Sequence, residues 1–250
     1  MTEPLRLPER VPVDAVIQCA MDMEAAPVLA ALDPADADAP QRIEVRHEGG
    51  AVRSFTLGTL AGRRVLVAVS GIGLANSAAA TARALALVDA PIVIAAGTTG
   101  GLARDIEVGQ VAAGTSTIYG AADATAFGYA MGQIPQMPVY YRSSDETAAR
   151  VRALADSFDA PVRIGRVVSV DSFVTAPIAD TVRAKFPDAI GADMETCAMA
   201  QIAWSCGVDW VSLRAVSDLC GPSADQDFHM DSEAAAEISA RAVAAYLALA

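Results

Sequence analysis

Three carboxylic acids follow apolar stretches of this chain, and such residues can perform acid–base chemistry. Asp218 ends the apolar run VSLRAVS within RAVSDLCG, while Glu24 and Glu195 lie in AMDME and ADMET. A carboxyl group removed from water can hold its proton near neutral pH, and a second carboxylate can accept one. The three residues therefore suggest a site that pairs an acid with a base.

Each of these features also has an ordinary structural interpretation. Asp218 could cap a following turn, and Glu24 or Glu195 could be a solvated carboxylate favoured by the dipole of a helix. The glycines of SGIG at 70–73 and GTTGG at 97–101 could serve turns alone. The stretch SGIGLANS also lacks the third glycine of a dinucleotide-binding fingerprint, so we do not expect NAD binding.

A layered α/β fold would bring these residues together, because ligands gather at the carboxyl ends of strands in open α/β sheets. Short segments rich in β-branched residues predict largely buried strands at 13–20, 64–70, 91–97, 162–170 and 208–217. Helical patterns alternate with these strands. The chain therefore predicts a three-layer α/β/α sandwich with a mixed, largely parallel central sheet.

Three helices can be located from the sequence. Apolar residues near helical spacing predict one over 74–88. Its inner face would carry Leu74, Ala78, Leu85 and Val88. A capping-box pattern, Ser143 with Glu146, predicts the start of the second. Asp231 precedes the apolar pattern of the third helix and predicts its start. The inner face of that helix would carry Ile238, Ala242, Tyr246 and Leu249.

The remaining segments bear on domain organisation. Residues 42–60 contain two β-like segments around Glu48-Gly49-Gly50, which predict a hairpin and hence a mixed sheet. MTEPLRLPERVP, residues 1–12, reads as a polar N-terminal arm. No linker or shift in composition interrupts residues 13–250, so we expect one domain there.

Charge and composition narrow the classes of function. The formal net charge is −12, with acidic residues spread along the chain, so neither nucleic acid nor anionic membranes are expected as partners. No apolar signal segment is visible, and Asp89 and Pro91 interrupt the most apolar region, so we expect a soluble, cytoplasmic protein. The four cysteines and two histidines lack metal-ligand spacing, so we expect no metal, cofactor or disulfide framework.

Taken together, the segments of the chain resemble one family, the 5′-methylthioadenosine/S-adenosylhomocysteine nucleosidases of the purine nucleoside phosphorylase superfamily. The matching segments, in the order expected of that family, are AMDMEAAPVLAAL, SGIGLANSAAAT, VIAAGTTGGLARDIEVGQV, DATAFGYAMGQIP, VVSVDSFV, FPDAIGADMETCAMAQIA and LRAVSDL. The most specific part is ADMETCA followed by RAVSD. The resemblance runs from about Val13 to the last helix and implies a nucleoside phosphorylase-like fold.

The resemblance implies hydrolysis of an N-glycosidic bond, which releases adenine from a 5′-substituted ribose. Positive charge builds on the ribose and negative charge on the departing base, so protonating the base lowers the barrier. By resemblance, Asp218 hydrogen-bonds purine N7 and donates that proton, which requires burial to raise its pKa. Glu24 would orient and deprotonate the attacking water. Glu195 would accept from the ribose hydroxyls, and at a helix N-terminus it should stay ionised.

Further residues match positions that contact the substrate in this family. Near the ribose, the water and the acid, these positions correspond to Met194, Thr98, Arg214 and Ser217. On the adenine side, Phe173 would stack on the base and the backbone of Val174 would read its edge. The ring of Phe173 could equally belong to the core, and the others could be ordinary turn or strand residues.

The 5′ substituent would meet apolar residues. By resemblance these are Met21, Ile72 and Phe228 of the same chain. Phe127 and Pro135, in TAFGYAMGQIP, match residues that reach the site of a partner subunit, which implies a homodimer.

The main rival is a phosphate-dependent phosphorylase of the same superfamily. Phosphate as the nucleophile needs cationic groups, and phosphorylases place an Arg three residues before the hydroxyl residue of GTTGG, with a Gly and another Arg in the first loop. The corresponding residues here are Ala95, Ala20 and Glu24. A carboxylate would repel phosphate, so we expect water as the nucleophile.

The sequence is also compatible with two more functions. A futalosine-type hydrolase would share the reaction and differ in the substrate. A non-catalytic nucleoside-binding protein would have no need of an acid and a base together. Departures from the family pattern are Cys19 at a small-residue position, Asp193 in place of Glu, the loop IYGAAD, and the SDLCGPSADQDFHM tail.

Overall fold

The computed structural model describes residues 9–33, 42–46, 52–222 and 224–249 of the chain, with β1 to β13, α1 to α6 and one short 3-10 helix, η1. The strands are β1 (Val11–Pro12), β2 (Ala15–Cys19), β3 (Arg42–Arg46), β4 (Val52–Leu60), β5 (Arg63–Val69), β6 (Val88–Asp89), β7 (Ile92–Ala95), β8 (Thr98–Gly101), β9 (Val111–Tyr119), β10 (Tyr141–Arg142), β11 (Val162–Ser169), β12 (Ala189–Asp193) and β13 (Asp209–Asp218). The helices are α1 (Asp22–Ala30), α2 (Leu74–Leu87), η1 (Thr125–Phe127), α3 (Asp145–Ser157), α4 (Ala176–Lys185), α5 (Thr196–Ser205) and α6 (Ala224–Ala248).

The main sheet is mixed, as predicted. Its strand order is β10-β9-β11-β12-β8-β13-β7-β2-β5-β4-β3. Strand β2 pairs in parallel with β5 and β7, and β13 pairs in parallel with β7 and β8. Antiparallel pairs join β3 to β4, β4 to β5, and β12 to β8. The parallel strands thus bring several carboxyl ends to one edge of the sheet.

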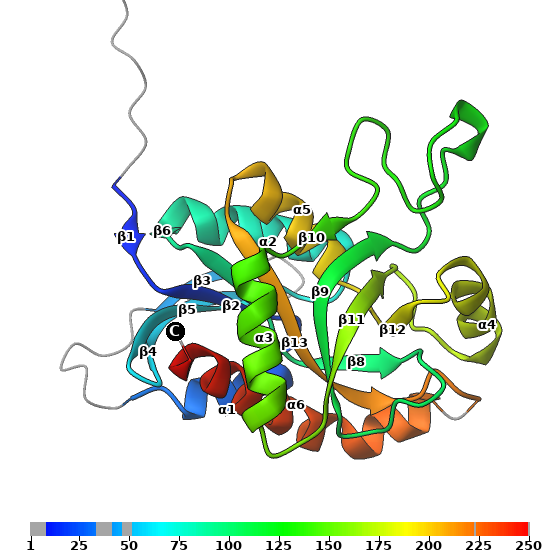
Figure 1. Cartoon of the computed structure of the whole chain (residues 1–250). Helices are drawn as coiled ribbons and strands as arrows, with labels where there is room; N and C mark the ends of the chain where they lie inside the picture. Colours follow the sequence, from blue (N-terminus) through cyan, green and yellow to red (C-terminus); the bar gives the residue numbers. More distant parts are fainter. Residues whose placement is uncertain (1–8, 34–41, 47–51, 223, 250) are drawn as a thin grey trace, which may run out of the picture.

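Helices cover both faces of this sheet, which gives the predicted three layers (Figure 1). One apolar core lies between the sheet and α1, α3 and α6, where Val28, Leu154 and Tyr246 pack. The opposite core packs Ala84 of α2 and Met199 of α5 against strands β2 and β7. Burial of these two faces explains why the predicted strands read as continuous apolar runs rather than as alternating ones.

Helix α2 occupies the predicted position, and Leu85 and Val88 are buried as predicted, but the rest of its buried face differs. Leu74 and Ala78 are only half-buried. The residues that the structure buries are Ser77, Ala80, Thr81, Ala84 and Leu85. A search for apolar periodicity cannot find this face, because two of its members carry hydroxyl groups.

Two predicted helix starts are wrong. The N-cap of α3 is Ser144, whose Oγ accepts a hydrogen bond from the amide of Thr147. Ser143 instead donates its hydroxyl to the carbonyl oxygen of Trp210. Helix α6 begins at Ala224, seven residues before the predicted start at Asp231. Ala224, the first residue of the helix, is fully buried.

The end of α6 also differs from the prediction. Tyr246 and Ala242 are fully buried and Ile238 packs against the same core, as the helical spacing indicated. Leu249 lies beyond the helix and is 44% exposed, so it does not belong to this face.

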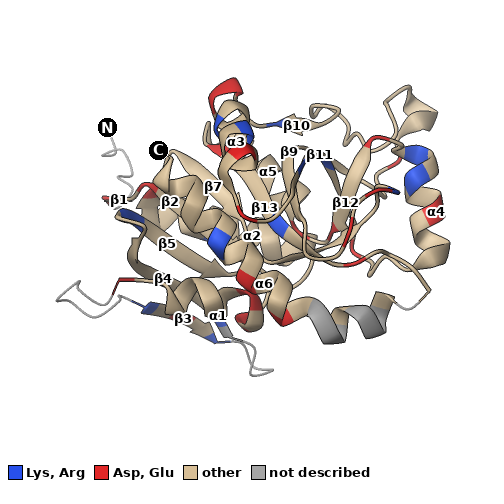
Figure 2. Ribbon diagram, turned by 60° about the horizontal axis from the view of Figure 1, so that its bottom comes forward, with Lys and Arg blue, Asp and Glu red and all other residues tan. Residues whose placement is uncertain are grey.

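The predicted hairpin corresponds to the antiparallel pair β3 and β4, whose register includes Arg46 opposite Val52. Its predicted turn, Glu48-Gly49-Gly50, lies outside the described residues, as does most of the predicted N-terminal arm. The last residues of that arm, Val11–Pro12, pair in parallel with β6. Acidic residues occur on many elements rather than in one segment (Figure 2). In the described part of the chain, no helix combines the length and apolarity needed to cross a membrane.

Candidate active site

A cavity of about 280 Å³ opens where β2, β8, β12 and β13 end. Ligand pockets in open α/β sheets form at such ends. The structure brings all but two of the predicted site residues to its walls. These residues are Met21, Glu24, Ile72, Thr98, Phe173, Val174, Met194, Glu195, Arg214, Ser217, Asp218 and Phe228.

The two exceptions are Phe127 and Pro135. They belong to the long segment between β9 and β10, which projects from the body of the molecule in green in Figure 1. Phe127 is 84% exposed, and Pro135 is exposed as well. Within one chain these residues do not contribute to the cavity wall.

Glu24 lies in the first turn of α1 and is 1% exposed. Its Oε2 accepts hydrogen bonds from the amides of Ala20, at 2.8 Å, and Met21, at 3.1 Å. Its Oε1 accepts from both the amide and the hydroxyl of Thr98, each at 2.8 Å. These donors hold the carboxylate in one orientation at the cavity wall.

Gly97 permits this close approach. A Cβ atom at that position would lie 2.3 Å from Cδ of Glu24, and the φ of +121° also favours glycine. The first glycine of GTTGG thus has a packing reason in addition to its role in the turn.

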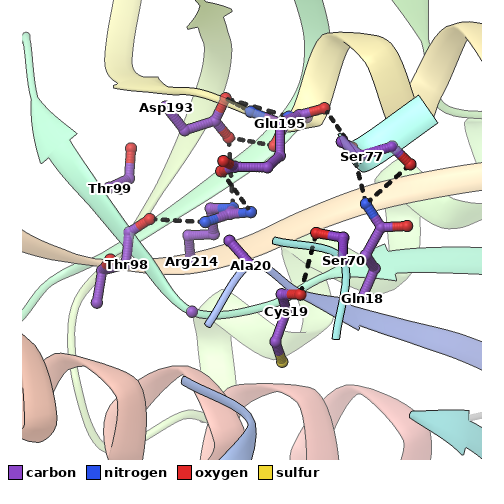
Figure 3. Close-up of polar contacts among 12 residues, drawn as sticks. Gln18, Cys19, Ala20, Ser70, Ser77, Thr98, Thr99, Asp193, Glu195 and Arg214 are labelled. Carbon is purple, nitrogen blue, oxygen red and sulfur yellow. Dashed lines mark hydrogen bonds and ion pairs between the residues drawn. The ribbon is translucent and has the colours of Figure 1, made fainter. Parts of the chain in front are cut away.

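A single guanidinium, that of Arg214, joins three carboxylates in the cavity wall, of which Figure 3 labels Asp193 and Glu195. Its side chain is 2% exposed, and it lies 3.6 Å from Glu24 Oε1, 3.3 Å from Asp193 Oδ2 and 3.2 Å from Glu195 Oε2. Its Nη1 also donates to the carbonyl oxygen of Thr98 at 2.9 Å. Burial lowers the pKa of Arg214, but the carboxylates, Glu195 above all, raise it more, so the guanidinium stays charged.

Asp193 is the carboxylate of this cluster for which the sequence suggested no role. Its Oδ1 accepts from the hydroxyl of Ser169 at 2.6 Å and from the amide of Thr196 at 3.1 Å. The hydroxyl of Thr196 donates to its other oxygen. Asp193 therefore accepts from backbone amides at the start of α5 and pairs with Arg214, although it is one methylene shorter than the Glu usual in the family.

Glu195 is the N-cap residue of α5 and is 3% exposed. Its Oε1 accepts from the amide of Gly73 at 2.8 Å. The expectation that it stays ionised is not supported, because burial raises its pKa from 4.5 to about 7, even though Arg214 acts in the opposite direction. Burial therefore favours the protonated form of this carboxyl group more than water does.

This raised pKa predicts a pH-dependent contribution to stability. Between about pH 4.5 and 7, the folded protein holds a proton on Glu195 that the unfolded chain has lost. The contribution is fully present below that window and is lost as the pH rises through it. Relative to a Glu195→Gln variant, the native protein should therefore lose free energy of unfolding between pH 5 and 7.5. Urea unfolding at both pH values tests this, and equal pH slopes in the two proteins would contradict it.

Asp218 ends β13 and is 3% exposed, as its place after an apolar run predicted. The hydroxyl of Ser217 donates to its Oδ2 at 3.0 Å, and the amide of Cys220 donates to its Oδ1 at 3.0 Å. Cys220 has a positive φ of 53°, the left-handed conformation that occurs in tight turns.

The opposite wall carries aromatic rings. Phe173 and Phe228 meet edge to face with ring centroids 5.7 Å apart, and Phe173 keeps 41% of its surface exposed. Val174 beside it is buried. A cavity that combines a partly exposed aromatic ring with a buried carboxylic acid suits a flat, apolar ligand with a polar edge.

The sequence interpretation missed several residues of the site. Cys220 lines the cavity, and its Sγ would lie 2.5 Å from a Cβ at Gly100, which explains the glycine. Asp171 accepts from the amide of Leu74 at 2.7 Å and so ties the loop before Phe173 to the start of α2. Both residues lie in segments that already contained predicted site residues. Cys220 belongs to RAVSDLCG and Asp171 belongs to VDSF, so the sequence could have indicated them.

Cys19 proves to be a core residue rather than part of the cavity wall. It is fully buried, and burial together with Glu24 raises the pKa of its thiol well above the usual range. A thiol in that state is not a nucleophile near neutral pH.

Comparisons with known proteins agree with this geometry. The family model described as "Phosphorylase superfamily" matches residues 14–249. A 5′-methylthioadenosine/S-adenosylhomocysteine nucleosidase from Marinomonas sp. is 33% identical over 78% of this chain and 86% of its own length. The nucleosidase of the same name from Staphylococcus aureus strain JH9 is 36% identical over 76% of this chain and 84% of its own length.

A solved structure extends the match to three dimensions. The 5′-methylthioadenosine/S-adenosylhomocysteine nucleosidase from Neisseria meningitidis, in complex with methylthio-immucillin-A, is similar with a TM-score of 0.83 at 33% identity. The alignment covers 94% of this chain and 98% of that one. The chain therefore belongs to the phosphorylase superfamily and, within it, to the family of 5′-methylthioadenosine/S-adenosylhomocysteine nucleosidases.

Proposed function

We propose that this nucleosidase hydrolyses the N-glycosidic bond of 5′-methylthioadenosine and S-adenosylhomocysteine, releasing adenine and the 5-substituted ribose. The observation that carries the hydrolytic assignment is the charge of the cavity. Among the described residues that line it, four carry carboxyl groups and one carries a guanidinium, which is already surrounded by three of those carboxyl groups. A phosphate dianion would find no uncommitted cation there, whereas neutral water meets no such repulsion.

In the proposed mechanism Asp218 is the general acid. As the bond between C1′ and N9 breaks, its electron pair leaves with the base, and Asp218 delivers a proton to N7. Its burial supports this role, as does its place in the same cavity as the partly exposed ring of Phe173, on which a purine could stack.

Glu24 is the proposed general base. Water adds to C1′ and gives its proton to Glu24, so one proton leaves the water and another reaches the base. The four hydrogen bonds to Glu24 support the role, because they leave the carboxylate little freedom to rotate away from a bound water. Arg214 lies between Glu24 and Glu195 and would balance charge as the proton moves.

Glu195 is proposed to hold the ribose hydroxyls, with Met194 against the sugar. With a pKa of about 7, the carboxyl group can accept from one hydroxyl and, when protonated, donate to another. Thr98 and Ser217 complete this side by orienting Glu24 and Asp218 through their own hydroxyl groups.

Met21, Ile72 and Phe228 are proposed to contact the 5′ substituent. We also propose a homodimer in which Phe127 and Pro135 complete the partner's 5′ side. The support is that Phe127 is a large aromatic residue left 84% exposed on a projecting loop. A cytoplasmic location is proposed as well, in keeping with four cysteines present as free thiols.

The discriminating experiment measures adenine release from 5′-methylthioadenosine with and without inorganic phosphate. We expect equal rates and 5-methylthioribose as the product, because water is the nucleophile. Strict dependence on phosphate, with a ribose 1-phosphate product, would identify a phosphorylase instead. Tight adenine binding without any turnover would indicate a non-catalytic binding protein, and a substrate panel with futalosine-type and 5′-deoxy nucleosides would rank the 5′ substituents.

A further inference from the structure

Three neutral polar side chains are buried and hydrogen-bonded to one another between α2 and β2. Ser77 and Thr81 of α2 are fully buried, and Gln18 of β2 is 1% exposed. Burying a hydroxyl or amide group costs free energy unless it is hydrogen-bonded, and apolar side chains would pack this layer without that cost. These three residues are therefore expected to have a role that apolar residues could not fill.

Their hydrogen bonds lead to Glu195 (Figure 3). Ser77 Oγ lies 3.0 Å from the carbonyl oxygen of Glu195. A carbonyl oxygen can only accept, so Ser77 donates its single proton there. Its Oγ in turn accepts from Nε2 of Gln18 at 2.7 Å. The two hydrogen bonds that link Gln18 to Ser77 and Ser77 to Glu195 can therefore run in only one donor-to-acceptor direction.

Thr81 contacts the oxygen of the side-chain amide of Gln18. Its hydroxyl lies 2.7 Å from Oε1 of Gln18 and 2.9 Å from the carbonyl oxygen of Ser77, so one proton serves two neighbouring acceptors. Because Nε2 of Gln18 must face Ser77, its Oε1 must face Thr81, and the orientation of the amide follows from the chemistry of its partners.

Helix α2 consequently holds Glu195 at two points that lie one turn apart. The amide of Gly73 donates to the carboxylate at 2.8 Å, and the hydroxyl of Ser77 donates to the backbone carbonyl. Gln18 belongs to β2, the strand that leads directly into the loop before Glu24. The same three hydrogen-bonded residues therefore relate the position of Glu195 to the strand that precedes the proposed base.

We propose that Gln18 and Ser77 are positioning residues, which set the place of the Glu195 carboxylate relative to the ribose hydroxyls. The inference rests on the proposed function, because the hydroxyls belong to the proposed substrate. Without the hydroxyl of Ser77, the carbonyl oxygen of Glu195 would keep the helical bond from the amide of Met199, at 3.1 Å, as its hydrogen bond within the described part of the chain. Displacement of a contacting group by about 1 Å can cost about 10²-fold in rate.

The first experiment compares native protein with Ser77→Ala on 5′-methylthioadenosine and on its 2′-deoxy and 3′-deoxy analogues. We expect kcat/KM for the parent nucleoside to fall between about 10- and 100-fold. It should fall much less for an analogue that lacks a hydroxyl held by Glu195, so discrimination between the substrates shrinks. Inhibition by adenine, which has no ribose, should be unchanged and provides a readout that does not depend on turnover of the analogues.

Ser212→Ala is the matched control. Ser212 is fully buried in β13, and its hydroxyl has no hydrogen-bond partner within the described part of the chain. The Ser212→Ala variant loses a buried hydroxyl group, as Ser77→Ala does, but it leaves the hydrogen bonds to Glu195 unchanged. Its discrimination between the substrates should therefore stay native. An equal loss of discrimination in Ser212→Ala, or native discrimination in Ser77→Ala, would overturn the proposal.

Two further variants separate positioning from folding. Ser77→Thr keeps a hydroxyl and should restore discrimination between the substrates. Gln18→Leu removes the donor to Ser77, and combining it with Ser77→Ala should cost less than the sum of the single losses, since both act through one contact. Additive losses with native-like thermal melting would refute the coupling. If the native protein itself releases no adenine, the proposed function fails rather than the positioning role.

Discussion

Asp218→Asn should lower turnover of 5′-methylthioadenosine by about 10²-fold or more while leaving adenine binding near native. Asn has nearly the same shape, and its carbonyl oxygen can still accept from the amide of Cys220. The hydroxyl of Ser217 can turn toward the carbonyl oxygen of Thr99, which lies 3.5 Å away. The amide can therefore donate a hydrogen bond to N7 of the purine, but it has no proton to transfer as the base departs.

The measurement is single-turnover release of adenine, together with the affinity for adenine. Asp188→Asn is a suitable control, because this aspartate is largely exposed and pairs with Arg166 at the surface. Near-normal turnover in Asp218→Asn would exclude Asp218 as the acid. Loss of adenine binding together with turnover would instead point to a role in binding.

Glu24→Gln is expected to reduce turnover between about 10²- and 10⁴-fold, the usual range for removing a general base. It should also lower stability by about 1–3 kcal/mol, because a buried amide group would be left facing a donor. Each oxygen of Glu24 accepts from at least one backbone amide, that of Ala20 on one side and that of Thr98 on the other. Whichever way the glutamine amide turns, its NH₂ group faces a backbone N–H.

Both effects can be measured on the same protein. Thermal melting gives the loss of stability, and turnover at a temperature well below the transition gives the loss of catalysis. Asp22→Asn changes a carboxylate in the same first turn of α1 that lies outside the cavity wall, and it should leave both quantities near native. If Glu24→Gln melted earlier but turned over normally, Glu24 would hold the loop together without acting as the base.

Much of the fold could be predicted because strand periodicity and helix periodicity are local properties. The run before Asp218 is largely apolar because β13 is buried over nearly its whole length, and the predicted strand matches β13 to within one residue. The start of α6 was predicted too late, because an Asp before an apolar run indicates a helix start but does not show how far the helix extends on its N-terminal side. Ser144 was missed as the cap of α3 because Ser143 beside it offered an equally good pattern.

The candidate site was predictable to the extent that its residues follow strands. Glu24, Thr98 and Asp218 all do so, and parallel pairing brings such positions to one edge. Asp193 attracted no role because its part in the site depends on pairing with Arg214, a contact across the fold. The apolar pattern assigned to α2 likewise pointed away from Ser77, which belongs to the buried face.

By itself, then, the sequence determined the alternation of strands and helices, the carboxylates after the strands, and the family. Only the tertiary structure decided that one buried guanidinium serves three carboxylates and that burial raises the pKa of Glu195 to about 7. It also decided that Ser77 reaches Glu195 across 118 residues of chain. The physical reason is that periodicity is written in neighbouring residues, whereas burial and through-space contacts depend on residues that only folding brings together.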